Sequence, residues 1–144
     1  MRNRWKLGCW GALALLLCCV LCGAAAAEES GNLIVNPGFE KLDAYGDPAG
    51  WEVSAWYREE GYSSYRADAA FPRSGTYCAA IENYADNDAR FTQVVDVEPE
   101  ELYLLSGWIR AEGVSVASSW GANLSVEGLY ARTRPVYDTQ GQWV

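Results

Sequence analysis

After residue 30, short alternating apolar runs follow one another, and this pattern constrains the fold more than any other feature of the chain. The runs are rich in Val, Ile, Tyr, Trp and Thr, and residues that favour turns separate them. Alternation with a period of two residues is typical of strands with one buried face, whereas helical periodicity is hardly found here. We therefore predict an all-β fold, an antiparallel β-sandwich of about seven or eight strands.

Turn residues bound each predicted strand. The strands are expected at residues 33–36, 51–57, 62–68, 76–83, 90–97, 101–111 and 122–127. Residues 142–144 read like the start of a further strand, so we expect the domain to lack its closing strands at the C-terminus. An edge left open in this way is prone to pairing or aggregation.

The best-marked run ends in a Pro-Gly turn. Residues 33–36 are predicted to form a strand, and Pro37 biases the residue before it toward an extended conformation. Pro37 and Gly38 suit the centre of a type II turn, because proline fixes φ and glycine accepts a positive φ. Phe39 is then expected to return to the core, while Glu40 points elsewhere.

Residues 1–27 have the pattern of a signal peptide. A basic start is followed by a stretch without charge at residues 7–27, which ends in three alanines. This stretch is also long enough to span a bilayer, so an uncleaved signal anchor is the alternative. Both interpretations place residues 28–144 outside the cytoplasm, because the basic residues stay inside. We expect a secreted or cell-surface domain that meets a membrane only if the leader is uncleaved.

The composition excludes several classes of function. Four of the five cysteines lie in the leader, so residues 28–144 keep only Cys78 and have neither an internal disulfide nor a cysteine zinc site. The chain has no histidine, so no Ser-His or Cys-His catalytic pair can form. Removing the three leader cations takes the net charge from −8 to −11, which disfavours nucleic acid as a partner. No carboxylate pair is singled out by spacing, and we predict that the protein is not an enzyme.

Five pieces of the sequence, taken in order, resemble the family 4 and family 9 carbohydrate-binding modules. They are residues 32–40 (NLIVNPGFE), 48–51 (PAGW), 73–77 (RSGTY), 93–99 (QVVDVEP) and 102–110 (LYLLSGWIR). The resemblance covers about residues 31–144 and implies a galactose-binding-like jelly roll that binds a glycan without transforming it. In those modules a carboxylate after the first turn commonly helps to hold a structural calcium ion, and Glu40 matches that position. The second carboxylate of the family motif is absent, so the alternative is that Glu40 is a solvated turn residue.

Another resemblance concerns residues 87–97, 121–130 and 137–143. These segments are similar to exterior modules attached to some bacterial membrane-embedded sugar transferases. This chain would then be the leading piece of a longer membrane glycosyltransferase, and a glycoside hydrolase fragment is a related alternative. A third possibility is a structural or interaction β-sandwich without a sugar site.

Sugar binding needs aromatic rings that stack on a pyranose and planar polar groups that bridge its hydroxyls. Several such residues alternate with the apolar face of the predicted strands. If these strands are neighbours in one sheet, a concave groove is formed by Glu82, Tyr84, Trp108, Arg110, Asn123 and Glu127. The alternative is that Glu82 and Arg110 only form an exposed ion pair across strands.

A second candidate site lies at the loop end of the predicted sandwich. Aromatic residues gather there around the turn at residues 59–61, and loops on a rigid scaffold often carry recognition. The cluster consists of Trp56, Tyr57, Tyr62 and Tyr65, and Trp120 follows another loop. These aromatics could instead only cover the edge of the sandwich.

Overall fold

The computed structural model describes residues 31–117 and 120–144. The signal peptide or anchor predicted at residues 1–27 lies outside these ranges. Four strands and no helix are found in the described ranges, so the all-β prediction is confirmed. None of the described segments is a helix of the length and apolarity that a membrane span requires.

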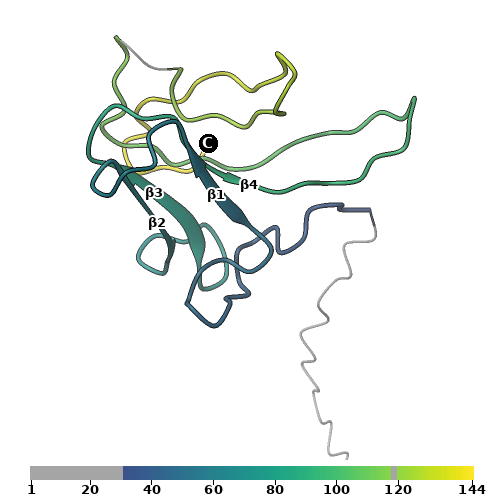
Figure 1. Ribbon diagram of the computed structural model, residues 1–144, viewed down its shortest axis with the longest axis horizontal. Helices are drawn as coiled ribbons and strands as arrows, with labels where there is room; N and C mark the ends of the chain where they lie inside the picture. Colours follow the sequence, from purple (N-terminus) through teal and green to yellow (C-terminus); the bar gives the residue numbers. More distant parts are fainter. Residues whose placement is uncertain (1–30, 118–119) are drawn as a thin grey trace, which may run out of the picture. The chain divides into compact units, whose positions relative to one another are not determined.

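The strands form two antiparallel pairs, coloured in sequence order in Figure 1. Strand β1 (Glu52–Ala55) pairs with β4 (Ala89–Thr92), and β2 (Ser63–Asp68) pairs with β3 (Cys78–Asn83). Strands β1, β2 and β3 lie inside predicted ranges, whereas β4 covers only residues 90–92 of the range predicted at 90–97. The antiparallel arrangement is therefore confirmed, whereas a complete jelly-roll sandwich is not shown by two sheets of two strands each.

A chain of aromatic rings connects the two sheets. Tyr65 of β2 meets Phe91 of β4 edge-on, with ring centroids 5.7 Å apart. Phe39 continues the cluster, with its centroid 6.1 Å from that of Phe91 and 4.8 Å from that of Trp51. Each such pair contributes about 0.5–1.5 kcal/mol beyond the burial of its area. Phe39 thus turns back into this aromatic cluster, where it is half-buried.

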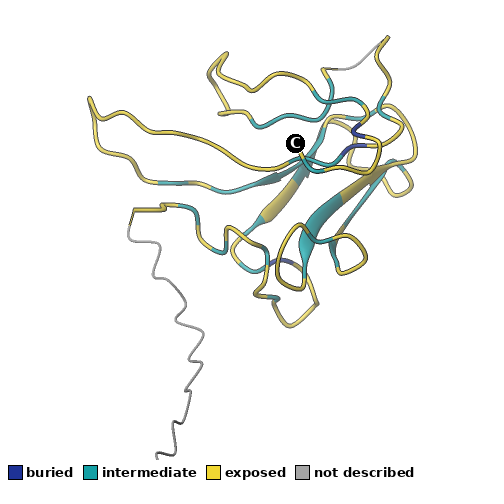
Figure 2. Ribbon diagram, turned by 180° about the vertical axis from the view of Figure 1, so that it is seen from behind, coloured by how far each residue is buried: buried dark blue, intermediate teal, exposed yellow. Residues whose placement is uncertain are grey.

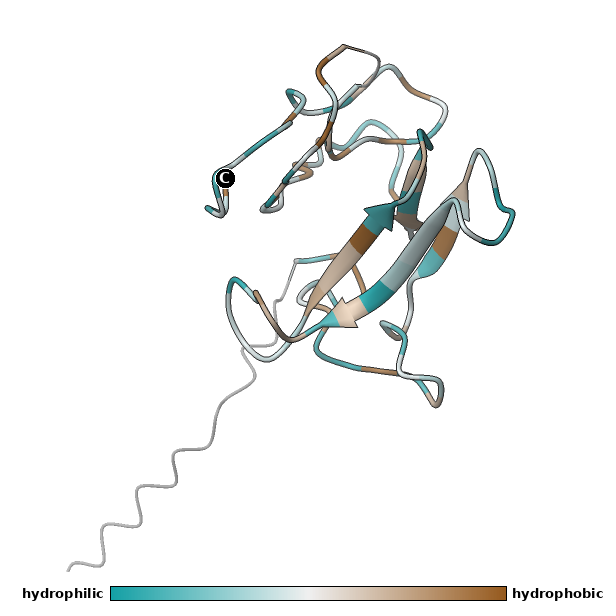
Figure 3. Cartoon of the chain, turned by 90° about the vertical axis from the view of Figure 1, so that its left-hand side faces the viewer, coloured by the Kyte–Doolittle hydropathy of each residue, from teal (hydrophilic) through white to brown (hydrophobic). Residues whose placement is uncertain are grey.

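Few residues of the described ranges are fully buried, and Figure 2 shows them as short dark segments. The buried residues there are Pro48, Ala111 and Thr139, and no large side chain of the described ranges is completely enclosed. Figure 3 shows hydrophobic residues along the loops as well as on the strands. Since burial of apolar surface is the main favourable term in folding, we expect these residues to form a marginally stable unit.

The strand predicted at residues 33–36 is wrong. Asn36 adopts a positive φ of 53°, which interrupts the extended backbone and which asparagine tolerates better than most residues. Val35 pairs with a side chain instead of a strand, because the Gln93 amide accepts from its N–H at 2.7 Å and donates to its carbonyl at 3.0 Å. The Pro-Gly turn does form, closed by the Phe39 N–H on the Asn36 carbonyl at 3.0 Å. Gly38 has no positive φ, so the turn is not of type II.

The strand predicted at residues 101–111 is also wrong. Within the described part of the chain, its backbone is paired only near its end with the C-terminal segment, where Ile109 and Val144 exchange two hydrogen bonds of 2.9 and 3.0 Å and the Ala111 carbonyl accepts from the Thr139 N–H at 2.9 Å. Leu102 is 100 % exposed and Leu104 is 91 % exposed, so the apolar run does not reach a core. The physical reason is that no neighbouring strand among the described residues supplies a ladder for this run.

The strand predicted at residues 122–127 is reduced to two isolated bridges. Ala122 pairs with Val136, and Ser125 pairs with Arg132. The Leu124 side chain lies over Gly107, where an added Cβ would stand 3.0 Å from a Leu124 methyl carbon. The run at 101–111 therefore does approach the segment at 122–127, through packing and not through a shared ladder.

Candidate functional site

Two residues of the predicted groove lie on or just after β3 and interact with β2. Glu82 accepts a hydrogen bond from Arg66 at 3.3 Å. Tyr84 donates its hydroxyl proton to Ser64 Oγ at 3.0 Å. The exposed ion pair considered between Glu82 and Arg110 does not form, because Arg66 of the adjacent strand takes the Glu82 carboxylate.

Trp108 and Arg110 both contact the loop that follows β2. The Arg73 guanidinium lies 3.8 Å from the centre of the Trp108 ring, and the Arg110 guanidinium lies 4.1 Å from the centre of the Phe71 ring. Arg110 also donates from Nε to the Gly141 carbonyl at 3.2 Å. One face of the Trp108 ring is thus covered by a cation, although the side chain remains 55 % exposed.

The last two groove residues lie in the bridged segment at residues 122–136. Asn123 donates from its side chain to the Gly121 carbonyl at 3.1 Å, and Glu127 is exposed. The sheet that would unite the six groove residues is not formed, since β3 pairs with β2, Ile109 pairs with Val144, and residue 122 has its own bridge. Sugar binding by these six residues stays a prediction.

Glu40 holds two pieces of the sequence together. Both of its carboxylate oxygens accept the Thr76 N–H at 3.0 Å, and one accepts the Tyr77 N–H at 3.3 Å. Gly75 precedes these N–H groups with a φ of 69°, and a Cβ there would collide with the carboxylate. No group of three or more metal-binding side chains occurs among the described residues. The contact joins the pieces RSGTY and NPGFE, and a calcium role for Glu40 stays a prediction.

Only part of the aromatic cluster predicted at the loop end is brought together by the structure, because Tyr65 packs on Phe91 and Trp120 lies against Arg132. Tyr57 and Tyr62 stack with centroids 5.0 Å apart and ring planes 28° apart. Asn87 fixes this loop, because its side-chain amide accepts from the Tyr57 N–H at 2.9 Å and donates to the Tyr57 carbonyl at 2.8 Å. The Trp56 N–H donates to the Asp88 carbonyl at 3.0 Å, and the Trp56 side chain is 73 % exposed.

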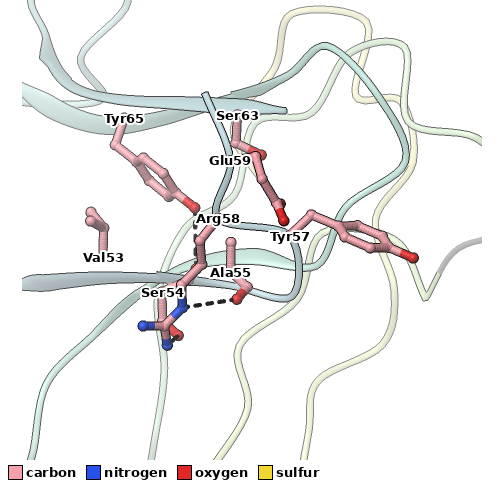
Figure 4. A pocket seen from close by; sticks show the side chains of 8 residues that line it. All are labelled: Val53, Ser54, Ala55, Tyr57, Arg58, Glu59, Ser63 and Tyr65. Carbon is pink, nitrogen blue, oxygen red and sulfur yellow. Dashed lines mark hydrogen bonds between the residues drawn. The ribbon is translucent and has the colours of Figure 1, made fainter. Parts of the chain in front are cut away.

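Beside this cluster is a pocket between β1, β2 and the loop that joins them, which we call the β1–β2 pocket (Figure 4). Its volume is about 150 Å³ and it opens to solvent. Its walls combine phenol rings, hydroxyls, a guanidinium and a carboxylate. It is lined by Val53, Ser54, Ala55, Tyr57, Arg58, Glu59, Ser63 and Tyr65.

Two polar side chains of the β1–β2 pocket, Tyr65 and Arg58, are hydrogen-bonded to strand β1. The Tyr65 hydroxyl donates to the Ser54 carbonyl at 3.2 Å, and burial raises the pKa of Tyr65, so the phenol stays protonated at neutral pH. The Arg58 guanidinium donates to the Ala55 carbonyl and to Ser54 Oγ, each at 3.4 Å. Sequence reasoning found the tyrosines but missed Arg58, whose only sequence signal is its place between the aromatic pair and Glu59.

No protein-family model, curated protein or solved structure matches the chain. The resemblance to carbohydrate-binding modules therefore stays a prediction from the residues alone.

Proposed function

We propose that residues 28–144 form a secreted or cell-surface module of the jelly-roll type that binds carbohydrate without transforming it, and that the glycan docks at the β1–β2 pocket. The observation that carries this proposal is the stacked pair of Tyr57 and Tyr62 beside a pocket that also offers a guanidinium and a carboxylate. Sites for small polar ligands combine an apolar or aromatic wall with a few convergent polar groups.

The size of the pocket suits one sugar ring. A cavity of about 150 Å³ accommodates a six-membered ring. The exposed Trp56 side chain offers further aromatic surface outside the pocket, next to the half-exposed Tyr57 ring of its wall, on which neighbouring units of a longer glycan stack.

The loop that carries the aromatic cluster is organised before any ligand arrives. The Asn87 amide holds both backbone groups of Tyr57 and also donates to Ser63 Oγ at 2.8 Å. A loop fixed in this way loses less conformational freedom on binding, which favours affinity.

A second candidate function is an interaction domain without a sugar site. The observation that favours it is the run at residues 94–108, which is mostly open to solvent and carries several large apolar side chains. Val94, Leu102 and Leu104 are the most exposed large hydrophobic residues of this run. Exposed apolar patches of this kind commonly mark protein contacts.

The test is retention of the protein in native gels that contain soluble polysaccharides, together with pull-down on insoluble ones. The proposal expects retention by at least one polysaccharide and its loss in Tyr57→Ala. Absence of retention by every polysaccharide, with a folded protein, would favour the interaction domain.

A further inference from the structure

We infer that Arg58 anchors a carboxylate, so that the ligand of the β1–β2 pocket is an acidic glycan that contains a uronic acid unit. This inference rests on the proposed function and specifies the chemistry of its ligand. The inference depends on which contacts the arginine side chains of the described residues make.

Most of these arginines already contact a carboxylate or an aromatic ring. Arg66 forms ion pairs with two carboxylates at 3.0 and 3.3 Å, and Arg90 forms one at 3.7 Å. Three others place the guanidinium carbon over an aromatic ring, 3.8–4.1 Å from the ring centre. They are Arg73, Arg110 and Arg132.

Arg58 makes neither of these two kinds of contact with the described residues. It lines the pocket, and within the described ranges no carboxylate lies at ion-pair distance from it. Its hydrogen bonds go to two neutral acceptors at 3.4 Å, which is long for this donor. A guanidinium has five N–H donors in a planar fork that matches a carboxylate, so most of its capacity is left for a ligand.

The remaining polar groups suit the hydroxyls of the same sugar. In Figure 4 the Glu59 carboxylate points toward the Tyr57 side of the pocket, whereas the Arg58 guanidinium points toward Ser54. The pocket therefore has a cationic end and an anionic end. A ring that carries one carboxylate and several hydroxyls matches both ends, because hydroxyls donate to Glu59 while the carboxylate accepts from Arg58.

The net charge of the chain opposes an anionic ligand at long range. Recognition must therefore come from the local contact, and binding is best measured near 0.15 M salt, where the Debye length is about 8 Å.

The experiment uses calorimetry on the full chain with three uronate oligosaccharides, from pectate, alginate and hyaluronan. Each is compared with its carboxyl-reduced form, which keeps the ring but replaces the carboxylate by a neutral alcohol. We expect at least one acidic form to bind about tenfold more tightly than its reduced form. Arg58→Gln should remove that difference between the acidic and the reduced form, whereas Arg134→Gln, outside the pocket, should preserve it.

The inference is overturned if no acidic form binds more tightly than its reduced counterpart, or if Arg58→Gln leaves the preference unchanged. The proposed function still stands in that case, provided that neutral oligosaccharides bind and Tyr57→Ala abolishes their binding. Failure of every glycan to bind overturns both statements. Melting curves of Arg58→Gln establish that the variant is folded.

Discussion

The side-chain amide of Asn87 bonds to both the backbone N–H and the backbone carbonyl of Tyr57, at 2.9 and 2.8 Å. One asparagine thus supplies the two bonds that a paired strand would otherwise supply. Because Tyr57 stacks on Tyr62 and lines the β1–β2 pocket, the position of the aromatic wall depends on a residue that lies 30 positions away in the sequence.

Asn87→Ala should therefore lower both stability and glycan affinity. Removal of the amide loses its hydrogen bonds to the Tyr57 backbone, and because both are exposed to solvent the cost is about 0.5–1.5 kcal/mol. The measurement is urea unfolding together with calorimetric titration. Asn123→Ala is the matched control, because that amide makes a single bond to the nearby Gly121 carbonyl. Equal effects of the two variants would contradict the role assigned to Asn87.

Trp108→Ala should reduce stability and leave glycan binding intact. The ring is covered on one face by Arg73, and an exposed cation–π pair contributes about 0.5–1 kcal/mol. A double-mutant cycle with Arg73→Ala, followed by urea unfolding, measures this coupling. Loss of glycan retention in Trp108→Ala would instead place the site in the groove predicted from the sequence.

Glu40→Gln should destabilise the fold to the same extent in calcium and in chelator. The carboxylate accepts the N–H groups of Thr76 and Tyr77, and because these bonds are exposed to solvent they contribute about 0.5–1.5 kcal/mol. Gly75→Ala should be destabilised as well, because a Cβ collides with Glu40. Melting temperatures with and without calcium are the measurement. A calcium-dependent rise in the wild type that Glu40→Gln abolishes would show that Glu40 is a metal ligand.

Stability should fall in acid partly through Asp68. The Ala70 backbone N–H, at 2.7 Å, and the Arg66 guanidinium hold the pKa of this carboxyl below its usual value. Because the folded pKa is the lower one, the stabilisation is present above the unfolded value of about 3.9 and is lost as pH falls through the folded value. Asp68→Asn should flatten this part of the pH profile of urea unfolding, and an unchanged slope would contradict the assignment.

The sequence predicted the local features of this fold better than its long-range contacts. Alternation and turn residues place β1, β2 and β3, and the tyrosines around residues 59–61 were expected to cluster. The apolar run at residues 101–111 was misread because a strand also needs a neighbour, and periodicity does not say whether one is present.

Contacts between distant loops gave no sequence signal. The hydrogen bond from the Thr76 N–H to Glu40 and the contact of Arg73 with the Trp108 ring join segments that are separated by more than 30 residues. The left-handed Asn36 also escaped prediction, because Pro37 favours an extended residue before it and the local amide bonds to Lys41 outweigh that preference.

The most direct test of the proposed site compares Tyr57→Ala with Tyr45→Ala. Both residues are exposed tyrosines, but Tyr45 lies in the turn at residues 43–47, outside the β1–β2 pocket. The measurement is the dissociation constant for the polysaccharide that retains the wild type most strongly. We predict that Tyr57→Ala weakens binding at least about tenfold, equivalent to about 1.4 kcal/mol, while Tyr45→Ala binds like the wild type. Equal affinities of the two folded variants would contradict the proposed site.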